Sequence, residues 1–209
     1  LFLESDSDTF SNELIFSKRF KNKNAFSVNF KNENRSTKGF ATNDVRSIFN
    51  EGTNPDDIRN QNWLTDGRKD DYNLDLTYSI KIDNKQTLRL DTGLQNVVET
   101  DNKETLDFND ISNNFSDFNA LQSFENRFET NQVKAGLGYE LNHKKGMFRL
   151  GLGSRWSQYE MKSLYNNNEF LNEKTEVLPE LSLSNSWKFG KAARLYVSYR
   201  YKGSLPYMN

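Results

Sequence analysis

The chain has 209 residues, of which 34% are hydrophobic and 27% charged, with a formal net charge of -1 at pH 7. No stretch approaches the roughly 18 consecutive apolar residues that a transmembrane helix needs, so helical membrane spans are excluded. The near balance of charge gives no reason to expect a nucleic-acid partner. The chain has no cysteine, which excludes disulfides and thiolate metal sites.

The first part of the chain predicts one hairpin followed by a long polar segment. Residues 1–11 are acidic and have no period, so we expect a loop there. Residues 14–20 and 25–31 predict two strands joined by a turn, because Phe26, Val28 and Phe30 alternate with polar residues. Residues 32–70 contain glycine and proline breakers and predict a polar connection, in which 43–49 form a short helix or an extra strand.

The second predicted hairpin has the clearest alternation in the chain. Residues 72–82 place their apolar side chains on one face, and 88–94 resume the pattern after a turn at 83–85. We expect Tyr78 and Ile80 to pair antiparallel with Leu90 and Leu88 across this turn. Residues 100–120 are rich in Asp and Asn and predict a second long connection.

Two further hairpins complete the predicted set. Residues 128–141 and 148–156 alternate around a turn at 142–146, and a third polar connection is expected over 165–174. Residues 177–189 and 194–201 then form a hairpin with Leu195, Val197, Tyr199 and Tyr201 on one face. The expected hairpins therefore span about 12–32, 71–97, 127–158 and 177–202, within a single segment over residues 1–209.

These elements predict an all-β chain, an antiparallel up-and-down meander of about eight strands. Alternation alone also fits a soluble β-sandwich. The asymmetry between short turns at one end and long polar connections at the other favours an outer-membrane barrel. Aromatic residues near the short turns suit a membrane interface; they are Phe20, Phe26, Phe148, Trp187 and Phe189.

Topology predicts that this meander is part of a larger transmembrane β-barrel. If the short turns are periplasmic, both ends of these eight strands lie on the extracellular side. A complete bacterial barrel has an even number of strands and normally keeps both ends in the periplasm. We therefore expect neighbouring strands to complete the wall.

Three segments also resemble a known family. They are 14–34 (LIFSKRFKNKNAFSVNFKNEN), 137–155 (LGYELNHKKGMFRLGLGSR) and 177–206, in which Leu178-Pro179-Glu180-Leu181, Tyr199-Arg200 and Leu205-Pro206 are the most specific parts. They resemble the β-barrel region of TonB-dependent-receptor-like outer-membrane proteins of Bacteroidetes. The resemblance implies a bacterial outer-membrane location, with lipid, a plug domain and the remaining barrel strands as partners. The family's plug domain and energy-coupling box have no counterpart in these residues.

Charged residues on the polar faces of the predicted strands are the candidate functional group. We expect them to face the lumen; they are Asp75, Lys81, Arg89, Asp91, Arg149, Arg155, Arg194 and Arg200. The alternative is that they form cross-strand pairs on any wet sheet face. Glycines at 136, 138, 151 and 153 on the same face would let another element pack closely.

No residue pattern points to catalysis, a cofactor or a metal. His143 is the only histidine and falls in a turn, so a zinc site is not expected. The acidic residues of 100–120 do not have the spacing of an EF-hand and are expected to be a flexible charged loop rather than a calcium site; they are Asp101, Glu104, Asp107, Asp110 and Asp117. We expect a protein that is not an enzyme.

The predicted function is uptake of a scarce solute by the intact receptor. The alternative is a soluble or surface-exposed β-sheet binding module with no membrane role. Exposed edges and an uncovered apolar face would allow the isolated chain to associate with itself.

Overall fold

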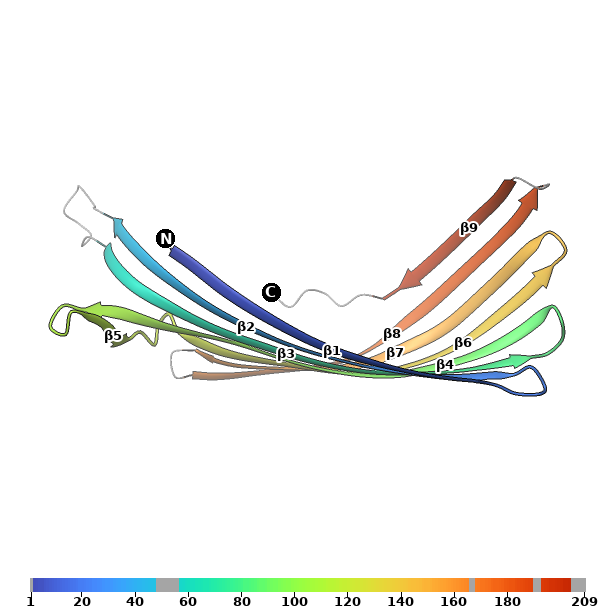
Figure 1. Cartoon of the computed structure of the whole chain (residues 1–209), viewed down its shortest axis with the longest axis horizontal. Helices are drawn as coiled ribbons and strands as arrows, with labels where there is room; N and C mark the ends of the chain where they lie inside the picture. The colour runs from blue at the N-terminus through green and yellow to red at the C-terminus, as the bar shows by residue number, and fades with distance from the viewer. Residues whose placement is uncertain (1, 48–56, 166–167, 190–192, 204–209) are drawn as a thin grey trace.

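The structure is a computed structural model that describes residues 2–47, 57–165, 168–189 and 193–203. These residues form one antiparallel sheet that curves as an open trough (Figure 1). Its strands are β1 (Phe2–Arg19), β2 (Ala25–Ser47), β3 (Asp57–Lys81), β4 (Gln86–Asn109), β5 (Asn114–Phe118), β6 (Phe124–His143), β7 (Gly146–Tyr165), β8 (Asn168–Phe189) and β9 (Ala193–Lys202). Within the described residues no helix is long and apolar enough to cross a membrane.

The strands pair in chain order, so the meander is confirmed. Eight of them follow the path β1-β2-β3-β4-β6-β7-β8-β9, and the short β5 pairs with the end of β4. Tyr78 pairs with Leu90 and Ile80 with Leu88, as the sequence predicts. The sheet is not closed, because within the described residues β1 pairs only with β2 and β9 only with β8.

Three predicted loops are instead strand. Residues 2–11, expected to be a loop, belong to β1 and pair with β2 up to Thr42. The predicted connection 32–70 is mostly the outer part of β2 and β3, paired from Asn32↔Tyr72 to Ser47↔Asp57. Residues 43–47 are therefore strand, while 48–49 lie outside the described residues. Of the predicted connection 165–174, residues 168–174 belong to β8, and 166–167 fall outside the described part.

The expected flexible loop 100–120 is also an ordered hairpin. β4 continues to Asn109, and β5 returns against it with Asp107 opposite Asp117. A turn at 119–123 then leads into β6, where Phe124 pairs with Lys103. Ser123 stabilises this turn, because its Oγ accepts from Thr105 N at 2.9 Å and donates to the Asn119 carbonyl at 2.8 Å.

The short turns advance steadily from hairpin to hairpin. One continuous register row contains Lys18, Phe26, Tyr78, Leu90, Leu137, Leu152, Leu181 and Tyr201. The last paired residues before the four short turns are Arg19, Lys81, His143 and Phe189. Counted along their own strands from this row, they lie one, three, six and eight residues closer to the turn. From the first to the last hairpin this is a shift of seven residues over six strand spacings.

That shift has a direct geometric meaning. We draw a line through the four short turns and take as the axis the direction perpendicular to that line. With about 3.3 Å per residue along a strand and about 4.8 Å between strands, the strands are then tilted by about 35–40° from this axis. Closed barrels have strands tilted by about 35–45°. By this definition the four short turns lie at one level along the axis.

Candidate functional site

The register divides the sheet into two faces of different chemistry. We call the face that carries Asp75 and Arg89 the polar face, and the face that carries Leu74 and Leu94 the apolar face. Directly paired residues of neighbouring strands point to the same side of a sheet, so the pairing assigns every strand residue to one face. The polar face lies inside the curve, because one hollow of about 990 Å³ on it is lined from Ser79 on β3 to Arg200 on β9.

All eight sequence-predicted residues lie on the polar face. Asp75 and Lys81 come from β3, Arg89 and Asp91 from β4, Arg149 and Arg155 from β7, and Arg194 and Arg200 from β9. The rows Thr77–Asp91–Gly136–Gly153–Glu180 and Ser79–Arg89–Gly138–Gly151–Ser182–Arg200 connect these strands.

Most of the predicted residues are engaged with neighbours on this face. Arg89 Nε lies 2.7 Å from Asp91 Oδ1, and the same carboxylate oxygen accepts from Thr77 Oγ1 at 2.7 Å. Arg149 Nε donates to Glu140 Oε2 at 2.8 Å. These ion pairs connect residues of the same strand or of adjacent strands, as expected for a wet sheet face, where each contributes at most about 1 kcal/mol.

The side chain of Arg155 is only 14% exposed. Its guanidinium donates to the Gly203 carbonyl at 3.0 Å, while its Nε lies 3.9 Å from Glu180 Oε1. Neither Arg155 Nε nor Glu180 Oε1 has a hydrogen-bond partner among the described residues, so the two groups interact as opposite charges without a direct hydrogen bond. Glu180 was not among the residues predicted from the sequence to lie on the polar face. It could have been found there, because it alternates with Leu181 and shares its face with Ser182 and Ser184 of β8.

Four glycines form a floor between these charged residues. Gly136 lies opposite Gly153, and Gly138 opposite Gly151, so two glycine pairs adjoin on β6 and β7. A hollow of about 630 Å³ lies over them and is bordered by Asp91, Lys134, Glu180 and Arg200 among others. This patch lacks side chains and can therefore accept an element that packs against the backbone.

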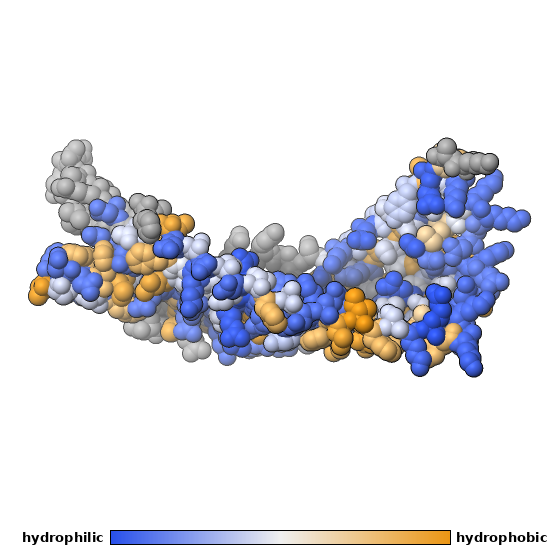
Figure 2. All heavy atoms as spheres, viewed as in Figure 1, coloured by the Kyte–Doolittle hydropathy of each residue, from blue (hydrophilic) through white to orange (hydrophobic). Residues whose placement is uncertain are grey.

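The apolar face carries a band that crosses the sheet. One row of it contains Leu14, Phe30, Leu74, Leu94, Val133, Trp156 and Val177. Leu14 and Val177 are 68% and 65% exposed, and Leu94 is 51% exposed. Patches of hydrophobic residues are visible on the face shown in Figure 2, with hydrophilic regions between them.

The band ends sharply at the next row away from the short turns. That row contains Asn12, Asn32, Tyr72, Asn96, Asn131, Gln158 and Thr175. The row beyond it includes the carboxylates Asp70, Glu129, Glu160 and Glu173, together with the apolar Phe10 and Val98. On β6 the band runs from Val133 to Leu141, nine residues, which span about 20–24 Å along the axis at the tilt derived above.

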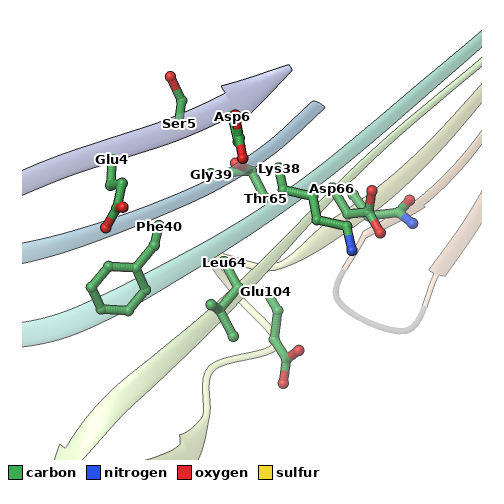
Figure 3. A pocket seen from close by; sticks show the side chains of 11 residues that line it. Glu4, Ser5, Asp6, Lys38, Gly39, Phe40, Leu64, Thr65, Asp66 and Glu104 are labelled. Atoms are coloured by element: carbon green, nitrogen blue, oxygen red, sulfur yellow. The ribbon is translucent and has the colours of Figure 1, made fainter. Parts of the chain in front are cut away.

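The apolar face has a hollow of its own, which lies beyond this boundary. Figure 3 shows Phe40 and Leu64 between Glu4 and Glu104, and the register places these four in one row. The hollow measures about 570 Å³. In the described part of the chain no three His, Cys, Asp or Glu residues gather as a metal site would require. Asp107 in particular accepts from Gln61 and Asn119 side chains, at 2.6 and 2.8 Å.

Comparisons with known proteins give no further assignment. No model of a known protein family matches the chain, and no curated protein sequence matches it.

Proposed function

We propose that this chain is part of the wall of a bacterial outer-membrane β-barrel of the TonB-dependent-receptor type. The observation that carries the proposal is the apolar band of one face, which on β6 is about 20–24 Å tall and ends at a row of amides and hydroxyls. A lipid-facing barrel wall has an apolar band of about this height on its outer face and a polar lumen on the other.

The open edges and the curvature support a larger closed barrel. β1 and β9 each leave one edge unpaired within the described residues, and the remaining strands of the parent protein would pair with them. The polar face with its glycine floor would then line the lumen, and a plug domain would pack there. The intact protein would take up a scarce solute, and we propose no catalytic role.

The strands extend well beyond the band. β3 has 25 residues, which corresponds to about 80 Å along the strand. Only the part near the short turns lies within the band, so the rest would project from the membrane on the extracellular side. The polar boundary at Asn96 and Asn131 would lie at the headgroup level.

Site-directed labelling tests the proposal directly. The chain has no cysteine, so a single cysteine can be introduced at each position from 88 to 94 of β4 and labelled with a fluorophore. Each labelled chain is then reconstituted into lipid vesicles. We expect quenching by brominated lipid at the even positions and by aqueous iodide at the odd positions. Position 64, on the same face but beyond the band, serves as a control that only iodide quenches.

The runner-up, a soluble β-sheet binding module, predicts a different result. Its apolar face would be covered by protein, so the even positions of β4 would be protected from both quenchers and would show no lipid contact. Such a result would overturn the membrane proposal.

A further inference from the structure

The short-turn end of the sheet carries an excess of positive charge. Residues 18–24, 81–85, 142–146, 188–189 and 193–194 contain ten Lys and Arg residues and one carboxylate, Asp83. The cations are Lys18, Arg19, Lys21, Lys23, Lys81, Lys85, Lys144, Lys145, Lys188 and Arg194. The chain as a whole has 28 basic and 29 acidic residues, so this end is strongly polarised relative to the rest.

These ten cations are not neutralised within the described sheet. Nine ion pairs connect its described residues, and all of them involve other cations. Lys188 and Arg194 lie directly opposite each other, which is a repulsive arrangement. The single carboxylate, Asp83, is occupied by the backbone amides of Lys85 and Gln86, at 2.6 and 2.7 Å.

Six of the cations lie in the turns or on the apolar face at the edge of the band: Lys18, Lys21, Lys23, Lys85, Lys144 and Lys145. The other four, Arg19, Lys81, Lys188 and Arg194, lie on the polar face at the same end. Lys18 Nζ lies 5.5 Å from the centre of the Phe20 ring, and that ring packs edge-on against Tyr78. Ile82 and Phe189 are 58% and 59% exposed. Hydrophilic side chains project from the end of the molecule that carries the short turns (right in Figure 2). Since the strand tilt brings the four turns to one level, the charges form an arc at one depth.

We infer that this basic arc binds the phosphates of anionic phospholipid headgroups in the leaflet next to the short turns. The inference rests on the proposed membrane-spanning wall. Charge complementarity carries it: a row of unpaired cations immediately outside an apolar band faces the layer where lipid phosphates lie. On the other side of the band the corresponding row carries Glu129 and Glu160, which are ion-paired with Arg127 and Lys162.

The test compares two variants of the whole chain, each with four Lys→Gln substitutions. The first changes turn residues Lys21, Lys85, Lys144 and Lys145, which are exposed and form no ion pair with described residues. The matched control changes Lys38, Lys69, Lys162 and Lys174, all on the far side of the boundary. Transfer from detergent into vesicles is followed by tryptophan fluorescence and far-UV circular dichroism, using phosphatidylcholine alone or mixed with phosphatidylglycerol.

The unmodified chain should partition more strongly into the anionic vesicles. At about 1 kcal/mol for each Lys near an anionic surface, the turn variant should lose roughly 100- to 1000-fold of this preference. The control variant should keep it, and 1 M salt should abolish it for all chains because the Debye length falls to about 3 Å.

Equal insertion of all chains into both kinds of vesicle would overturn the headgroup inference and leave the membrane proposal standing. Equal loss of preference in the turn and control variants would also overturn it, because net charge rather than the basic arc would then be responsible. Failure of the unmodified chain to enter either vesicle would overturn the membrane proposal together with this inference.

Discussion

The Nδ2 amide of Asn96 donates a hydrogen bond of 2.8 Å to Oδ1 of Asn131, one step above the apolar pair formed by Leu94 and Val133. Both asparagines lie on the same face as these apolar residues, so the chemistry of that face changes within two residues. In the proposed membrane-spanning wall, Asn96 and Asn131 would lie where the hydrocarbon layer ends on β4 and β6.

A charge at the middle of the band should be far more costly than one at its edge. Leu137 lies midway along the band on β6 and is 46% exposed. In lipid vesicles we expect Leu137→Arg to lower the free energy of unfolding by about 2–4 kcal/mol, because the guanidinium would enter hydrocarbon. Gln158→Arg, in the boundary row, should cost about 0–1 kcal/mol. Urea unfolding followed by tryptophan fluorescence measures both. Similar costs at the two positions would contradict the assigned depth.

The sequence predicts the parts of the strands that lie within the band, because one face there selects apolar side chains and the other polar ones. Residues 72–82 and 88–94 therefore show a period of two. The outer parts of the same strands have no such period. Asn34 and Arg35, or Arg68 and Lys69, point to opposite faces and are all polar, since both faces are wet. Without alternation these segments resemble loops in sequence, and only the pairing reveals them.

The period of two also predicts that the eight charged candidates share one face, and the strand pairing puts all eight on the polar face. Their partners were harder to find. Glu180 approaches Arg155 only through the register between β7 and β8, and a single sequence does not determine register between strands. The turn at 119–123 depends on side-chain to backbone hydrogen bonds of Ser123 and Thr105, which no hydrophobic period encodes.

Gly146 should not tolerate a side chain. A Cβ at this position would collide with the backbone carbonyl oxygen of Ser186 on β8. We expect Gly146→Ala to destabilise the fold by about 1–3 kcal/mol, because the backbone of β7 or β8 must shift. Gly67→Ala is the matched control: the nearest atom there is 3.8 Å from the added Cβ, so a change within about 0.5 kcal/mol is expected. Equal tolerance at both positions would show that the β7–β8 register is wrong.

The Thr105 amide, which is hydrogen-bonded to the turn at 119–123, should exchange slowly. Thr105 is fully buried, and its amide donates to Ser123 Oγ at 2.9 Å. Ser123→Ala removes this acceptor and leaves a buried amide without a partner, at a cost of about 1–3 kcal/mol. Ser112→Ala at the exposed hairpin tip should change stability by less than about 0.5 kcal/mol. Hydrogen exchange at the Thr105 amide is the readout. Fast exchange in the unmodified chain would contradict the hydrogen bond between Thr105 and Ser123.

The turn between β3 and β4 should respond to acid at Asp83. Hydrogen bonds from the backbone amides of Lys85 and Gln86 hold the pKa of the Asp83 carboxyl below its ordinary value. Because the folded pKa is lowered, the stabilising contribution is present above the unfolded pKa and is lost as the pH falls through the folded value. A carbon-13 NMR titration of Asp83 should give a midpoint below that of an exposed model Asp. Asp83→Asn should remove this acid dependence, and a midpoint at or above the ordinary value would refute the assignment.

The last prediction concerns the chain in water without detergent. Its apolar face exposes large side chains in a continuous band, and β1 and β9 each present an unpaired backbone edge in the described sheet. Both features favour association, since apolar surface and free strand edges are stabilised by contact with another copy. In detergent-free buffer, light scattering should give a mass above that of the 24.4 kDa chain that rises with concentration. Detergent micelles should return it to one chain per micelle. A well-packed monomer whose mass does not depend on concentration, with a strong near-UV circular dichroism signal, would instead favour the soluble binding module.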